Sequence, residues 1–160
     1  MITTFRIDER LIHGQIIATW LKSLGITHLI VANDELSKDE SRQRMLKLAV
    51  PNDVKCLIKS VDDVIRVLRD ERCQKMKIML ICGNPNDALK LLKSIPGINE
   101  VNLANFGTIT KPEIKDKLSV SPMVYLDKDD VLIVNEIIDL GKPVFTQKTP
   151  VEVKKVLKKL

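Results

Sequence analysis

A short segment near the N-terminus brings together an acid, a guanidinium, an imidazole and a glycine. Asp8, Arg10, His13 and Gly14 follow directly after an apolar stretch that ends at Ile7. A neutral imidazole nitrogen is a nucleophile, and much of an exposed histidine is neutral at cytoplasmic pH. A planar guanidinium can hold two phosphate oxygens at once. The segment therefore predicts a site where His13 accepts and returns a phosphoryl group while Arg10 binds its oxygens.

The neighbouring residues have supporting roles in this hypothesis. A histidine's reactive nitrogen is selected by the hydrogen bond that the other nitrogen makes, and Asp8, or alternatively Glu9, is placed to orient the imidazole or Arg10. Gly14 would allow close backbone approach to a ligand, and Gln15 could donate or accept within the first turn of a helix. The spacing Arg-x-x-His-Gly also occurs by chance, so on spacing alone a structural or merely exposed histidine remains an alternative.

The elements that must position this segment alternate between β-rich and helical patterns along the chain. This alternation predicts an α/β fold, an open twisted and mainly parallel sheet with helices on both faces. Strands are expected at residues 2–7, 28–32, 55–58, 77–82, 100–103, near Val120, and at 144–147. Helices are expected at residues 15–24, 38–49, 61–70, 85–94, 128–140 and 151–159. Ligands collect at the carboxyl ends of such strands, where the Asp8–Gly14 segment would lie.

Some helix boundaries carry explicit signals. Gly25 and Gly141 each follow a helical pattern, where a glycine commonly ends a helix. Ser60 precedes another pattern with Asp63 three residues later, a loose variant of the capping box. These local signals agree with the expected order of elements.

Length and composition favour a single domain over residues 1–160, because the 160-residue chain shows no repeat, linker or shift in composition. No apolar run approaches the ~20 residues needed to cross a bilayer, and the start MITTFRIDER lacks the features of a secretory signal. We therefore expect a cytoplasmic protein. The last ten residues, VEVKKVLKKL, form a basic amphipathic pattern that would either touch an anionic partner or simply be solvated.

Residues 6–15, RIDERLIHGQ, closely resemble the signature of the IIB subunits of the mannose, fructose, sorbose and N-acetylgalactosamine class of the sugar phosphotransferase system. Three further segments stand in the order typical of that family: VAND at 31–34, VNLANFG at 101–107 and QKTP at 147–150. The resemblance thus covers essentially the whole chain. It implies a transferase that acts in sugar transport, a protein-N(pi)-phosphohistidine–sugar phosphotransferase.

The resemblance also implies roles and partners. His13 would receive a phosphoryl group from a phosphohistidine on the IIA subunit and pass it to a sugar bound by the membrane IIC and IID subunits. Arg10 would contact the phosphate and Asp8 would support the loop. Neither a metal ion nor a nucleotide cofactor is expected, the protein would associate peripherally with the permease, and a homodimer is possible. The membrane subunits would select the sugar, so the chain leaves its identity open.

Other residues are expected to bind phosphate or to line the rim of the site. Asn, Asp and Gly are also favoured in turns for backbone reasons, so turn residues are an equal alternative for several of them. Relatives often carry glycine where Ala104 stands, which bears on how closely that loop approaches the phosphate. The expected phosphate-binding or rim residues are Gly14, Gln15, Arg6, Asn33, Asp34, Asn105, Phe106 and Gly107.

Three other functions compete with phosphoryl transfer. The net charge of +5 favours an anionic partner, but acidic residues are interspersed with basic ones and few aromatic residues are present to stack on nucleic acid. A regulatory or binding domain of the same fold, one that does not feed sugar transport, is the main alternative. A nucleotide-binding enzyme ranks last because neither GxGxxG nor a P-loop is present. The other histidine, His28, is expected to be packed or at the surface.

Overall fold

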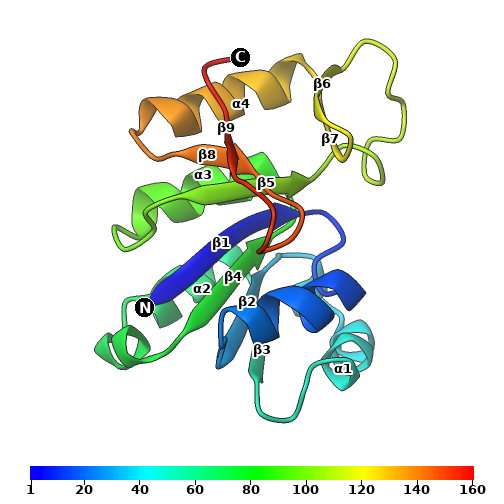
Figure 1. The fold of residues 1–160 in the computed structure, drawn as a ribbon. Coiled ribbons are helices and arrows are strands. Elements are labelled where there is room, and N and C mark those ends of the chain that lie inside the picture. Colours follow the sequence, from blue (N-terminus) through cyan, green and yellow to red (C-terminus); the bar gives the residue numbers. More distant parts are fainter.

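The computed structural model describes residues 1–160 and is built around one seven-stranded sheet, with a two-stranded hairpin beside it (Figure 1). All neighbouring strands of the sheet run parallel except the last pair, which is antiparallel. The spatial order of strands is β3-β2-β4-β1-β5-β8-β9. The strands are β1 (Ile2–Asp8), β2 (His28–Ala32), β3 (Lys55–Lys59), β4 (Ile78–Cys82), β5 (Val101–Asn105), β8 (Val144–Thr146) and β9 (Lys155–Val156), and the hairpin pairs β6 (Leu118–Ser121) with β7 (Val124–Leu126).

Helices cover both faces of the sheet. The segment after β1 is helical over residues 14–23, with a π-helical turn at Ile16–Leu21, and short 3-10 turns occur at Leu36–Lys38 and Glu71–Lys75. The α-helices are α1 (Glu40–Leu48), α2 (Val61–Leu68), α3 (Pro85–Ser94) and α4 (Lys128–Asp139). The larger hydrophobic core packs under α2, α3 and α4, and the smaller one under the helical segment 14–23. The predicted α/β open sheet is confirmed.

The central strands follow from a simple alternation of side chains between the two cores. On β4, Met79 and Ile81 enter the smaller core, whereas Ile78, Leu80 and Cys82 enter the larger one. Because successive side chains point to opposite faces, a strand covered on both sides is apolar throughout. None of the helices is long and apolar enough to cross a membrane.

The boundary signals seen in the sequence have structural counterparts. Gly25 and Gly141 adopt positive φ angles of 58° and 74° directly after helices. Ser60 caps α2, since its hydroxyl accepts a hydrogen bond from the Asp63 amide at 3.2 Å. The Asp63 carboxylate contacts the Ser60 hydroxyl at 2.9 Å, so the pair is a variant of the capping box.

The helix predicted at residues 151–159 is wrong. This segment is extended, and its two strand residues pair antiparallel with β8, Val156 opposite Phe145 and Lys155 opposite Thr146. Val151 and Val153 are almost fully exposed. An isolated helix of about nine residues is marginal without burial of its apolar face, whereas β8 offers unpaired backbone groups. The short strand expected near Val120 is one arm of the β6–β7 hairpin.

Candidate functional site

β1 carries alternating apolar and charged residues up to its carboxyl end. Phe5 and Ile7 enter the larger core, which directs Arg6 and Asp8 to the opposite face of the sheet. β1 lies between β4 and β5, and the register with β5 brings Asp8 beside Asn105. The central position of β1 thus places a charged cluster at the carboxyl edge of the sheet, where open α/β folds bind ligands.

Asp8 is the common acceptor for the charged groups around it. Its side chain is fully buried and lies 3.0 Å from Arg6 Nη2 and 2.9 Å from His13 Nε2. Arg10 donates to it from the backbone amide at 3.1 Å and from Nε at 3.2 Å, and Asn105 Nδ2 donates at 3.3 Å. One carboxylate therefore fixes two arginines and the imidazole relative to one another.

The environment of Asp8 keeps it ionised. Burial alone raises the pKa of Asp8, but the hydrogen bond with His13, the charge of Arg6 and the hydrogen bond with Arg10 outweigh burial and lower the pKa to about 2. The carboxylate is therefore an acceptor at every physiological pH. A permanent acceptor requires the imidazole nitrogen facing it to carry a proton.

His13 presents its other nitrogen away from Asp8. Nε2 is engaged by Asp8, while Nδ1 forms no hydrogen bond within the protein. The His13 carbonyl accepts the first helical hydrogen bond, from the Ile17 amide at 3.2 Å, so the histidine stands at the helix N-terminus. Only 16% of its side chain is exposed, so His13 is reached through a cavity and does not project from the surface.

The turn between β1 and the helical segment is strained at Leu11. The Leu11 amide donates to the Asp8 carbonyl at 2.9 Å, and Leu11 adopts a φ of 58°, which residues other than glycine rarely occupy. Its buried side chain belongs to the smaller core. Core packing therefore supports the strained turn that brings His13 back to Asp8.

A cavity of about 500 Å³ opens onto His13. Its lining is basic, and the buried carboxylate of Asp8 lies beneath it. The lining includes the predicted residues Arg6, Arg10, Gly14 and Gln15. It also includes Ala104, which stands where relatives often carry glycine. Met123 and Lys148 complete the lining. Met123 was not singled out from the sequence, and Lys148 stands in the QKTP segment without an assigned role. The arrangement can hold an anion beside a nucleophilic nitrogen.

Two predicted rim residues lie outside this cavity. Asn33 accepts a hydrogen bond from the Leu36 amide at 2.8 Å, and Asp34 accepts one from the Val61 amide at 2.9 Å. They follow β2, which β4 separates from β1 in the sheet. Their contacts organise a turn and the start of α2, which is the turn alternative for this pair.

The second predicted segment, residues 105–107, divides between site and hairpin. Asn105 reaches Asp8, although its buried Oδ1 has no partner. Phe106 is buried and exchanges backbone hydrogen bonds with the hairpin residues Met123 and Tyr125. Gly107 has a φ of 86°, and a Cβ there would lie 1.9 Å from the Tyr125 carbonyl oxygen. Neither Phe106 nor Gly107 lines the cavity.

Glu9 acts on a loop and not on the imidazole. Its carboxylate accepts hydrogen bonds from the amides of Thr108, Ile109 and Thr110 and from both threonine hydroxyls. Burial raises the pKa of Glu9, but these hydrogen bonds outweigh burial and lower the pKa to about 2. Glu9 thereby holds in place residues 108–110, which follow β5.

The comparisons with known proteins agree with this geometry. Residues 2–160 match the family described as the PTS system sorbose subfamily IIB component, where PTS denotes the phosphotransferase system. The chain belongs to this family. A probable phosphotransferase enzyme IIB component of Streptococcus pyogenes serotype M6 is 38% identical, covering 100% of this chain and 99% of the relative.

Other similar proteins support the same placement of this IIB component. The crystal structure of the N-acetylgalactosamine-specific IIB component 1 from Escherichia coli has a TM-score of 0.85 and 27% identity, covering 99% of this chain and 100% of the other. The mannose-specific EIIAB component of Escherichia coli K12 is 30% identical over 79% of this chain, which corresponds to 38% of the relative. The sequence-based assignment to this family and to a phosphoryl carrier of sugar uptake is confirmed.

Proposed function

We propose that this IIB component carries a phosphoryl group on Nδ1 of His13, between a IIA phosphohistidine and a sugar bound by membrane IIC and IID subunits. The observation that carries the proposal is the 2.9 Å contact between His13 Nε2 and the buried Asp8 carboxylate. Because that contact requires a proton on Nε2, the lone pair of the neutral ring lies on Nδ1. The activity is thus a protein-N(pi)-phosphohistidine–sugar phosphotransfer.

Both transfer steps make or break a P–N bond at Nδ1 of His13. In the first, the Nδ1 lone pair forms a bond to phosphorus while the P–N bond of the donor breaks and its electron pair stays on the donor imidazole. In the second, the sugar hydroxyl attacks phosphorus, the electron pair of the P–N bond returns to Nδ1, and the hydroxyl proton is released. Asp8 accepts the Nε2 proton's hydrogen bond throughout, which holds the ring and its tautomer.

The basic cavity supplies what a loose phosphoryl transition state needs, namely positioning and positive charge. Arg10 is 30% exposed at the cavity wall, and its Nη1 has no partner within the protein. Arg6 is buried 3.0 Å from Asp8 and contributes charge from below. The first amides of the helical segment, at Gly14 and Gln15, add donors for the same oxygens.

Membership of the family supports the proposed partners and location. The mannose-specific relative joins an A and a B component by name in one chain, which supports a IIA protein as the donor. We place the protein in the cytoplasm, where IIA works, in peripheral contact with the permease. Gly14, Gln15, Arg6 and Arg10 are its proposed phosphate-binding residues, and residues 1–160 its single IIB domain.

The decisive experiment follows phosphotransfer from phosphoenolpyruvate through the general carrier proteins and a IIA protein, with intact mass as the readout. Wild type should gain one acid-labile phosphoryl group. His13→Ala should gain none and retain the wild-type fold by circular dichroism, because His13 makes few core contacts. Labelling retained in His13→Ala would refute the assignment.

His28→Ala is the matched control. His28 begins β2 at the opposite, amino edge of the sheet, and its Nδ1 contacts the Thr27 hydroxyl at 2.8 Å. This variant should be labelled like wild type. An active donor that labels neither wild type nor His28→Ala would point to the regulatory alternative, a domain with the fold but without the chemistry.

A further inference from the structure

Lys148, near the far end of the chain, lines the His13 cavity. It lies in the segment after β8, it is exposed, and it shares the cavity lining with His13, Arg10 and Gly14. It participates in no ion pair anywhere in the protein, whereas Arg6 and Arg10 both pair with Asp8. Lys148 is therefore the one cation of the cavity that no carboxylate neutralises.

The backbone around Lys148 is fixed by residues of the site itself. The Trp20 indole Nε1 donates to the Lys148 carbonyl at 3.1 Å, and the Arg6 guanidinium lies 5.1 Å from the centre of the Trp20 ring. The preceding Gln147 carbonyl accepts hydrogen bonds from Asn102 Nδ2 at 2.8 Å and from Arg6 Nη1 at 3.4 Å. These hydrogen bonds to the carbonyls of residues 147 and 148 hold the Lys148 Cα at the cavity wall.

The charges of the cavity indicate what Lys148 meets. With His13 neutral, Arg6, Arg10 and Lys148 contribute three positive charges against the single negative charge of Asp8. The surplus of two is close to the charge of a phosphoryl group near neutral pH, roughly −1.5 to −2. Without Lys148, the phosphorylated site would keep an excess of negative charge.

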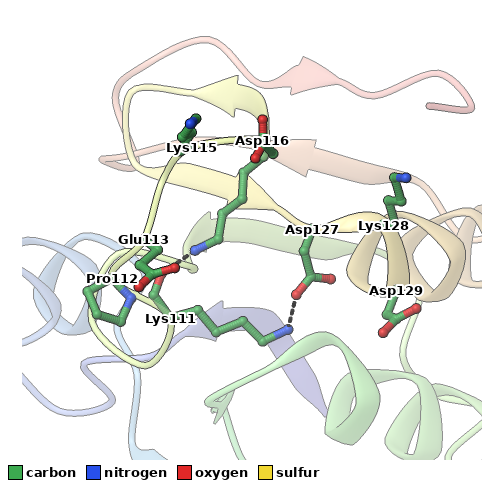
Figure 2. A pocket seen from close by; sticks show the side chains of 9 residues that line it. Lys111, Pro112, Glu113, Lys115, Asp116, Asp127, Lys128 and Asp129 are labelled. Atoms are coloured by element: carbon green, nitrogen blue, oxygen red, sulfur yellow. Dashed lines mark hydrogen bonds and ion pairs between the residues drawn. The ribbon is translucent and has the colours of Figure 1, made fainter.

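A second cavity of the molecule shows the opposite arrangement. The cavity of about 670 Å³ beside the β6–β7 hairpin and α4 also contains lysines, but acidic residues line it beside them, among them Glu113, Asp127 and Asp129 (Figure 2). Lys111 pairs with Asp127 and Asp130, and Lys117 donates to the Gly107 carbonyl at 2.9 Å. Lys111 and Lys117 hold a loop in place, and Lys115 and Lys128 share their cavity with carboxylates, whereas no acidic residue lines the His13 cavity beside Lys148.

We propose that Lys148 is a phosphate-binding residue, whose ammonium contacts the phosphoryl group on His13 and stabilises its dianion during transfer. This inference rests on the proposed function of His13. Arg10 and the helix N-terminus approach the phosphoryl group from the β1 side, and Lys148 approaches it from the β8 side. The two sides together enclose the charge that moves between donor and acceptor.

The test combines phosphorus NMR with transfer kinetics on the full chain. Wild type, Lys148→Met, Lys148→Arg and Lys158→Met are phosphorylated through phosphoenolpyruvate, the carrier proteins and IIA, and the phosphorus resonance is titrated with pH. Lys158 is an exposed lysine of the same terminal segment with no ion pair, so Lys158→Met removes the same charge elsewhere. Lys148→Met keeps the apolar stem of the side chain and removes only the ammonium.

We expect Lys148→Met to raise the pKa of the phosphoryl group by roughly one pH unit, because an adjacent cation favours the dianion. Its transfer rate should fall about tenfold, Lys148→Arg should restore most of both, and Lys158→Met should match wild type. A wild-type phosphoryl pKa in Lys148→Met would overturn the inference, even if transfer slowed, because the lysine would then act only on docking. Wild type that takes no phosphoryl group would instead refute the function on which the inference rests.

Discussion

Two arginines pair with Asp8, and they differ in burial although they look equivalent in the sequence. Arg6 is 1% exposed and Arg10 is 30% exposed, although both pair with the same carboxylate. A buried guanidinium contributes a fixed charge, whereas a partly exposed one can turn a free edge toward an incoming phosphoryl group. The difference in burial therefore supports Arg10 as the proposed direct phosphate contact.

Arg10→Lys should slow phosphotransfer by roughly 10- to 100-fold, since a charge-assisted hydrogen bond contributes about 1.5–3 kcal/mol and an ammonium cannot reproduce the planar fork. The free energy of unfolding should change by less than about 1 kcal/mol because Arg10 is partly exposed. Transfer rates and urea unfolding measure the two effects. Arg66→Lys, in an exposed pair with Asp63, is the control. Wild-type transfer in Arg10→Lys would remove Arg10 from the mechanism.

The segment between β5 and α4 supports the site mainly through contacts outside the cavity. Glu9 fastens residues 108–110, and Lys111 ties the same segment to the start of α4 through Asp127 and Asp130. The β6–β7 hairpin then packs against Phe106 and Gly107 and brings Met123 to the cavity. Residues 105–107 thus serve mainly as the surface against which the β6–β7 hairpin packs.

Gly107→Ala tests that conclusion. Its φ of 86° and the 1.9 Å approach of a Cβ to the Tyr125 carbonyl oxygen should lower the free energy of unfolding by about 2–4 kcal/mol. Gly97→Ala is the control, because a Cβ there meets nothing within 4 Å. Urea denaturation compares the variants, and equal stability of Gly107→Ala and wild type would contradict the structure.

Elements with strong local signals were predictable, and those decided by distant contacts were not. Residues 78–82 form a buried strand because every side chain there is apolar, and Ser60, Gly25 and Gly141 mark helix boundaries through their own chemistry. Residues 151–160 adopt an extended form because the edge of β8 offers backbone partners, which no local pattern encodes. Lys148 joins the cavity through Trp20 and Arg6, contacts invisible to spacing along the chain.

Across the whole molecule, adjacent carboxylates link the site to global stability. Asp8 and Glu9 both have a pKa of about 2 in the folded protein, below the ordinary values of 3.8 and 4.5. The unfolded chain therefore binds more protons than the native protein as the pH falls through this range. The stability contributed by these groups is fully present above the ordinary values and is lost as the pH falls toward 2.

Urea unfolding at a series of pH values should therefore show a free energy of unfolding that declines from about pH 5 downward. Glu9→Gln should be less stable than wild type at pH 7 and should show a shallower decline, because one of the carboxylates with a lowered pKa is gone. Glu113→Gln is the matched control, since the Glu113 side chain accepts no hydrogen bond within the protein. Identical acid profiles for Glu9→Gln and wild type would show that the 108–110 contacts contribute nothing.

The contacts of Trp20 and Arg6 with residues 147 and 148 also bear on when the site can form during synthesis. β1 is the first strand to leave the ribosome, yet its neighbours β4 and β5 come much later and Lys148 later still. A nascent chain that already displays His13 therefore lacks Asn105 beside Asp8 and the cation opposite. Unfinished chains therefore lack residues that complete the cavity around His13.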